Sequence, residues 1–142
     1  MAVGLFATPP STKTVRNVVA ATIAVTLFHF TDNFISIDTY PAPAWQPDWF
    51  EWVVLASWPI FTAVGVLAYR AYRDGTYPRA HVALIAYSYT GLISLGHFTS
   101  GSPDEFTTRG LVSIAIDAIA GTAVLLTALR SIVARRRTTQ AA

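Results

Sequence analysis

Four long apolar runs, separated by more polar segments, dominate the pattern of this chain. They cover residues 15–35, 52–72, 80–98 and 110–132. A helix of about 20 apolar residues matches the roughly 30 Å hydrocarbon core of a bilayer. Helices also pair their own backbone groups, which a bilayer requires. The pattern therefore predicts an all-α integral membrane protein, with one four-helix domain over residues 1–142 and an outer loop at 36–51.

Composition supports a membrane protein and removes several other classes. Hydrophobic residues make up 53% of the chain and charged residues 13%, which is too apolar for an ordinary soluble domain of 142 residues. Cysteine is absent, which excludes disulfides, thiolate nucleophiles and iron–sulfur sites. The net charge is +2, and its basic residues are clustered rather than spread over one face, so we expect no nucleic-acid partner.

The distribution of charge predicts an orientation in the membrane. Basic residues flank the start of the first run, the junction of the second and third, and the end of the fourth: Lys13, Arg16, Arg70, Arg73, Arg79, Arg130 and Arg135–Arg137. The positive-inside rule then places the N and C termini in the cytoplasm. We expect the membrane to be a bacterial-type plasma membrane. The other loops face outward, where Trp45, Trp49 and Trp52 would form an aromatic belt.

The triplet His-Phe-Thr occurs twice, at His29–Thr31 and His97–Thr99. Aligning the two copies also matches Thr22 with Thr90, and Thr26 with Ser94. Together with a second alignment between the second and fourth runs, this pattern is that of a parallel internal repeat of two helix pairs. Membrane helices use a small set of residue types, so chance resemblance is the competing interpretation.

Five polar residues at membrane depth are the candidate ligand-binding site. His29, Asp32 and Asn33 share one face of the first helix, His97 reaches a similar height on the third, and Asp117 lies two turns into the fourth. Ionisable residues inside a membrane span are costly and commonly functional. If Asp117 faced lipid, a homo-oligomer would be needed to cover it.

This inventory fits several chemistries. His29 and His97 with a carboxylate could bind zinc, iron or manganese, although their spacing matches no metal motif. The same groups could relay protons. An apolar cavity bearing a few polar groups could bind a lipid. The structural alternative is that the side chains only join the helices by hydrogen bonds.

The outer loop contains the stiff segment 40–47, Tyr-Pro-Ala-Pro-Ala-Trp-Gln-Pro. Its prolines exclude a helix and favour an extended course. Such a segment could cover the outer mouth of the bundle as a lid, or it could act only as a spacer. The sequence favours neither.

The order of these features resembles the EXPERA-type membrane proteins, the emopamil-binding and sterol-isomerase-like group. The resemblance rests on His29–Asp32, Tyr40-Pro41, Pro43-Ala44-Trp45 and Pro59, followed by Ile85-Ala86-Tyr87-Ser88. The chain is shorter than that family usually is, and Glu51 lies only at the edge of the second helix. The resemblance implies a bundle with a cavity for a sterol-like or other lipid ligand, and Asp32 as a ligand-contacting acid.

Three functions therefore remain open. The first is binding of a lipid or small apolar molecule in an outer-half cavity lined by His29, Asp32, Asn33, His97 and Asp117. The second is a metal- or haem-dependent membrane enzyme or redox partner that uses the same residues. The third is a structural or assembly subunit of a larger membrane complex. The sequence identifies no cofactor and no reaction.

Overall fold

Each apolar run of the sequence forms a helix in the computed structural model, which describes residues 8–42, 46–47 and 49–140. The α-helices are α1 (Thr12–Ile35), α2 (Phe50–Arg73), α3 (Tyr77–Leu92) and α4 (Thr108–Gln140). Three short 3-10 helices accompany them: η1 (Ile37–Thr39), η2 (Ile93–Thr99) and η3 (Pro103–Glu105). The described residues contain no strand, so the prediction of an all-α fold with four helices is confirmed.

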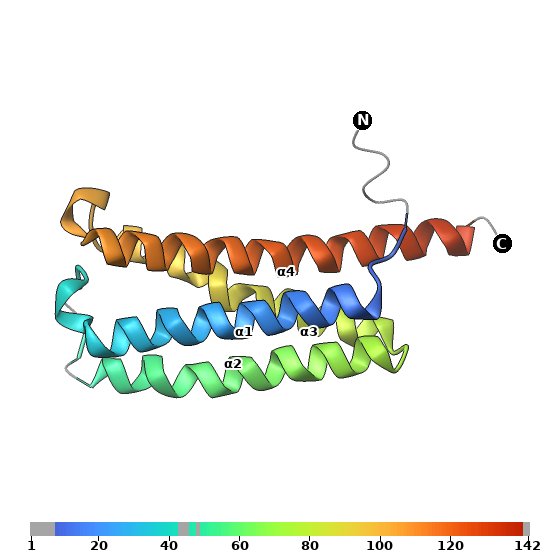
Figure 1. Ribbon diagram of the computed structural model, residues 1–142, viewed down its shortest axis with the longest axis horizontal. Coiled ribbons are helices and arrows are strands. Elements are labelled where there is room, and N and C mark those ends of the chain that lie inside the picture. Colours follow the sequence, from blue (N-terminus) through green and yellow to red (C-terminus); the bar gives the residue numbers. More distant parts are fainter. Residues whose placement is uncertain (1–7, 43–45, 48, 141–142) are drawn as a thin grey trace.

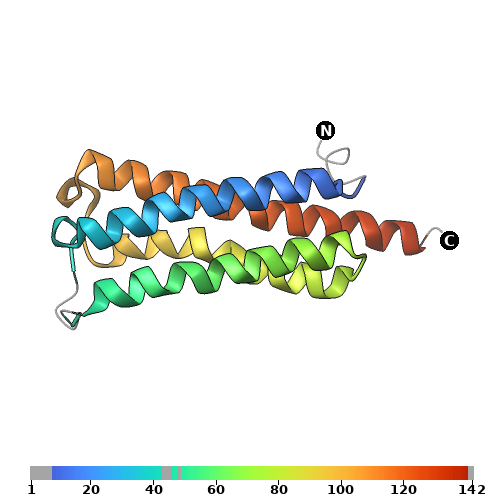
Figure 2. The ribbon, with the colours of Figure 1, turned by 60° about the horizontal axis from the view of Figure 1, so that its bottom comes forward.

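The four helices form an antiparallel bundle in which each packs against the next along the chain and α4 closes back on α1 (Figures 1 and 2). Helices α1 and α3 therefore lie on one diagonal, and α2 and α4 on the other. Both termini and the turn between α2 and α3 lie at one end, here called the terminal end (Figure 1). The opposite end, which carries residues 36–42, 46–47, 49 and 100–107, is called the loop end.

Local chemistry accounts for where helices start and stop at the terminal end. The Ser11 hydroxyl accepts a hydrogen bond from the Thr14 amide at 3.1 Å, which caps the start of α1. Gly75 follows α2 with φ of 76°, a left-handed conformation that glycine adopts without strain. The tight turn at Gly75 sets α3 antiparallel to α2.

The third apolar run differs from a single regular helix. Its α-helical part ends at Leu92, and the chain continues as η2 to Thr99. The Ser94 hydroxyl donates to the Gly91 carbonyl oxygen at 2.5 Å, a local bond that competes with regular α-helical pairing. Together α3 and η2 extend about 38 Å, because 3-10 geometry rises faster per residue than α-helix.

Three helices are long and apolar enough to cross a membrane: α1, α2 and α4. Large apolar side chains also point outward from the bundle instead of into it. Ile60 on α2 is 66% exposed and Ile119 on α4 is 68% exposed. A soluble domain rarely carries so much apolar surface, so the surface is compatible with a membrane protein.

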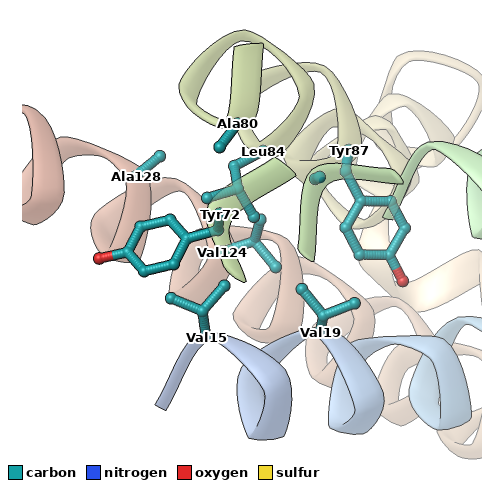
Figure 3. Close-up of a cluster of buried hydrophobic side chains, with 9 residues drawn as sticks. Val15, Val19, Tyr72, Ala80, Leu84, Tyr87, Val124 and Ala128 are labelled. Atoms are coloured by element: carbon teal, nitrogen blue, oxygen red, sulfur yellow. The ribbon is translucent and has the colours of Figure 1, made fainter. Parts of the chain in front are cut away.

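The core of the terminal half is apolar and contains side chains from all four helices (Figure 3). Its members are Val15, Val19, Ala68, Tyr72, Ala80, Leu84, Tyr87, Val124 and Ala128. Nearer the middle, α3 and α4 touch backbone to backbone. A Cβ on Gly91 would overlap the Asp117 carbonyl oxygen, and one on Gly121 would lie 2.6 Å from the Ser88 carbonyl oxygen. These glycines set the depth at which Asp117 enters the bundle.

Candidate functional site

The loop half of the interior is lined by polar side chains at helical spacing. On each helix these polar side chains lie on the face that is turned toward the centre of the bundle, and all of them are buried. The set comprises Thr22, Thr26, His29 and Asn33 on α1, Thr90 on α3, Ser94 on η2, and Ser113 and Asp117 on α4. Most buried polar side chains thus lie in the loop half of the bundle, while Ser131 in the terminal half is hydrogen-bonded to His81.

His29 is the centre of this polar interior. Its Nδ1 lies 2.9 Å from the Ser113 hydroxyl of α4, and its Nε2 lies 3.1 Å from the Asn33 side-chain nitrogen one turn along α1. The amide nitrogen can only donate, so Nε2 accepts and the ring proton sits on Nδ1, donated to Ser113. Both ring nitrogens of His29 are therefore satisfied in the neutral form.

Asn33 connects the two copies of the His-Phe-Thr triplet. Its side-chain nitrogen lies 3.3 Å from His97 Nε2 as well as 3.1 Å from His29 Nε2. The two imidazole rings meet edge to face with centroids 5.6 Å apart. Because α1 and α3 lie on one diagonal of the bundle, this contact crosses its centre. His29, Asn33 and His97, which the sequence proposed as one site, do lie together.

Asp117 lies behind His29, deeper in the bundle. Its side chain has no solvent exposure, and Oδ2 lies 3.8 Å from His29 Nε2. Neither carboxylate oxygen has a hydrogen-bond partner among the described residues. Asp117 faces the interior, so it does not need a second copy of the chain to cover it. A buried carboxyl group without hydrogen-bond donors is energetically costly, which makes Asp117 a candidate functional residue.

Asp32 belongs to a separate cluster at the loop end. Its Oδ2 accepts a hydrogen bond from the Tyr40 hydroxyl at 2.5 Å, and its Oδ1 accepts from the guanidinium group of Arg109. Arg109 also donates to the Ser36 hydroxyl at 2.8 Å. Asp32 thus ties the end of α1 to the following loop and to the start of α4.

Tyr40 extends this cluster toward the histidines. Its ring lies 4.9 Å from the His97 ring, centroid to centroid. Burial and the hydrogen bond to Asp32 raise the pKa of the Tyr40 hydroxyl above its ordinary value. Sequence reasoning missed Tyr40, Arg109 and Ser113 as site residues. Two signals were present: Arg109 is the only basic residue of the loop end, and Ser113 precedes Asp117 by one helical turn.

A cavity of about 490 Å³ lies against the histidines, between α1, α2, η2 and the loop. Its polar wall includes His29, Asn33 and His97. Its apolar wall comes largely from one face of α2, with Phe50, Val53, Val54, Ser57 and Phe61, joined by Phe30 and Ile93. Pro41 and Gln46 of the loop also contact the space. Pro43, Ala44, Trp45 and Asp48 lie outside the described residues.

Asp32 and Asp117, the two acids that the sequence placed with the histidines, are not among the residues that line the cavity. Asp32 lies on the far side of Tyr40, and Asp117 lies behind His29. The polar side chains that line the cavity are therefore imidazole, amide and hydroxyl groups, and neither carboxyl group is among them.

The described residues contain no group of three histidine, cysteine or acidic side chains placed to hold a metal ion. The Asn33 amide nitrogen lies between the His29 and His97 Nε2 atoms, where a shared metal would need to bind. Ser113, His29 and Asp117 follow one another in the order of a hydrolytic triad. Ser113 does not line the cavity, so a molecule held there does not meet its hydroxyl.

Comparison of the chain with protein-family models, with curated proteins and with solved structures found no match. The resemblance to EXPERA-type proteins stays a prediction.

Proposed function

We propose that this chain is an integral membrane protein that binds a lipid or another small apolar molecule in the cavity at the loop end. Three apolar helices and an outward-facing apolar surface support its place in a membrane. The chain would cross four times, because α3 and η2 together extend far enough to span the hydrocarbon core. The positive-inside rule would then place the loop end outside the cell.

The observation that carries the proposal is the two-sided chemistry of the cavity. Its volume of about 490 Å³ falls in the range that small-molecule sites occupy. One wall offers the imidazole and amide groups of His29, Asn33 and His97, and the facing wall is mostly apolar. This arrangement suits an amphiphile whose polar head lies against the histidines and whose apolar body lies along α2.

The loop supports the same function as a lid. Pro41 and Gln46 contact the cavity, and Tyr40 is held by Asp32 immediately beside them. The EXPERA-type resemblance would make Asp32 a ligand contact. In the arrangement proposed here, Asp32 instead holds the lid, and His29, Asn33 and His97 contact the ligand.

Native mass spectrometry of the protein purified in mild detergent, with solvent extraction of the bound molecule, tests this function. Val54→Trp would fill the cavity from its apolar wall, whereas Ile60→Trp on the same helix introduces the same side chain at an outward-facing position that is 66% exposed. We expect wild type and Ile60→Trp to carry the same apolar molecule, and Val54→Trp to lose it while keeping its helical circular dichroism.

Two results would overturn the proposal. One is a wild-type protein that carries no apolar molecule even after incubation with a total lipid extract of its host cells. The other is equal retention in Val54→Trp and Ile60→Trp, which would place the molecule on the outer surface of the bundle. Retention of a metal or haem instead would favour the enzyme or redox function.

A further inference from the structure

A second function is built into the polar interior, behind the cavity. We propose that His29 and Asp117 together hold one exchangeable proton, which reaches them from the loop-end cavity and not from the terminal end. The proposal does not depend on which molecule the cavity binds. It rests on the unpartnered carboxyl group of Asp117, on the position of His29 between that group and the cavity, and on the apolar core beyond.

The carboxyl group of Asp117 is buried without a hydrogen-bond donor in the described part of the chain. Asp117 has no solvent exposure, and both its oxygens lack a hydrogen-bond partner among the described residues. The nearest ring nitrogen, His29 Nε2, accepts from Asn33 and so presents no proton to Asp117 across the 3.8 Å between them. An ionised carboxylate would be left there without compensation. One proton, on either Asp117 or His29, removes this cost.

A proton can reach Asp117 from the cavity through the His29 ring. His29 lines the cavity on one side and faces Asp117 on the other. A proton arriving in the cavity binds the Nε2 lone pair and breaks the hydrogen bond from Asn33, which keeps its contact with His97. The new N–H then faces Asp117 Oδ2, and transfer to that oxygen leaves both groups neutral. Ser113 accepts from Nδ1 throughout, which reserves Nε2 for the exchange.

The proton path from the cavity ends at Asp117. Toward the terminal end, beyond the buried hydroxyl groups of Thr22 and Ser88, the interior is closed by Val19, Leu84 and Val124 (Figure 3) and by Ala68. Val124 lies two turns of α4, about 10 Å, beyond Asp117. Tyr87 is the ionisable side chain of the described core that lies nearest Asp117, and Leu84 and Val124 lie between it and Tyr72 (Figure 3). Proton exchange is therefore one-sided.

The other ionisable side chains near the pair either have partners of their own or do not line the cavity. From α1, Asp32 is held by Tyr40 and Arg109. From η2, His97 bonds to Asn33. From α3, the Tyr87 hydroxyl is buried, and its ring packs on Gly65 of α2. Helix α2 has no ionisable residue between Glu51 and Tyr69. His29 and Asp117 are thus the pair that can exchange a proton with the cavity.

Infrared difference spectroscopy of the protein in vesicles tests the proposal through the carboxyl stretching band. Because the chain has no cysteine, Ser102→Cys at the exposed loop end provides a single labelling site to select vesicles of one orientation. After a pH step on the loop-end side, we expect a carboxyl band that is lost in Asp117→Asn. The band should be retained in Asp104→Asn, which removes an exposed carboxyl group at the same end.

Two further variants separate a proton path from a structural effect. Asp117→Glu should shift the band and keep its response, which covers the case in which Asp117→Asn fails to fold. His29→Gln keeps Asp117 but removes the ring nitrogen, so the band should remain while its response to the pH step slows. A pH step on the terminal side should give no response until the vesicle has equilibrated.

The proposal would be overturned by any of three results. The first is a carboxyl band that survives in Asp117→Asn, since it would belong to another residue. The second is an Asp117 band that responds equally fast from both sides. The third is an unchanged response in His29→Gln, which would remove His29 from the path.

Discussion

Asp32 joins three parts of the chain through one carboxylate. It accepts hydrogen bonds from Tyr40 in the loop and from Arg109 at the start of α4, while it sits near the end of α1. Its side chain is almost fully buried, whereas that of Arg109 is 59% exposed. Hydrogen bonds to a buried charged group are worth more than surface ion pairs, because the buried group has no water to replace a lost partner.

Replacing Asp32 with asparagine should therefore destabilise the protein by about 1–3 kcal/mol, measured as a lower midpoint of thermal unfolding in detergent. The matched control is Asp74→Asn, which breaks the exposed pair between Arg73 and Asp74. That change should have almost no effect, because exposed ion pairs contribute little. Equal effects of the two substitutions would contradict the structural role of Asp32.

Tyr40 should titrate later than ordinary tyrosines. Burial, and then the hydrogen bond to Asp32, raise its pKa, so folding favours the neutral phenol. This contribution to stability is complete below pH about 10, the ordinary tyrosine value, and is lost as the pH rises toward the raised pKa. The ultraviolet absorbance of phenolate, compared between wild type and Tyr40→Phe, measures it. A Tyr40 signal that rises together with the exposed tyrosines would contradict this expectation.

At the scale of single residues, the sequence predicted some contacts and missed others. Spacing on one helix placed His29 near Asn33, and the structure shows that contact. The partners of Asp32 and His29 across the bundle, Arg109 and Ser113, lie 77 and 84 residues away in the chain. Such contacts depend on how α4 is rotated against α1, and apolar periodicity does not specify that rotation.

Among the elements, α3 and α4 form the tightest pair. Gly91 and Gly121 face each other there, and neither has room for a Cβ atom. Close backbone approach of this kind is a common way for membrane helices to pack, because dispersion contacts replace the missing hydrophobic effect. The pair also fixes the position of the Asp117 backbone, whose carbonyl oxygen lies beside Gly91.

Gly91→Ala should destabilise the bundle by about 1–3 kcal/mol, because the new methyl group would meet backbone atoms that cannot move independently. Gly96→Ala is the matched control on the adjoining η2, since a Cβ there meets nothing within 4 Å. Thermal unfolding of the two variants in the same detergent gives the comparison. A Gly91→Ala protein as stable as Gly96→Ala would show that the two helices can separate without cost.

The helices were the most predictable feature of this structure. Four apolar runs predicted four helices because length and hydropathy directly reflect the cost of exposing side chains and backbone in a bilayer. The change from α3 to η2 was not predicted, since it depends on a hydroxyl bonding back to the chain at Ser94. The internal repeat stays a prediction: Thr22 and Thr90 are both buried, yet His29 lies in an α-helix and His97 in a 3-10 helix.

For the whole molecule, the arrangement of charge predicts which side of the membrane each end faces. Ser102→Cys at the loop end should react with a membrane-impermeant maleimide in intact cells. Gln140→Cys at the terminal end should react only after the cells are permeabilised. The unmodified chain has no cysteine and is the blank for both. The reverse pattern would invert the orientation, and labelling of both sites in intact cells would show that α4 does not cross the membrane.

The cavity is a property of the whole molecule that the sequence could not supply. Its walls come from α1, α2, η2 and the loop, and each contributes only a few side chains. The positions of Asp32 and Asp117 in the sequence predicted that both line the cavity, but neither is among its lining residues. The difference arises because helix rotation and loop course decide which side of a residue faces open space.

The weak burial of α2 has a consequence for how a molecule would reach the cavity. Only 11% of its most apolar stretch is buried, compared with 39% for α1 and 33% for α4. The α3–α4 pair is held together by its glycines, whereas α2 buries the smallest share of its apolar residues against the other helices. A lipid-soluble molecule would then enter sideways, by parting α2 from α1, and would travel from bilayer to histidines without passing through water.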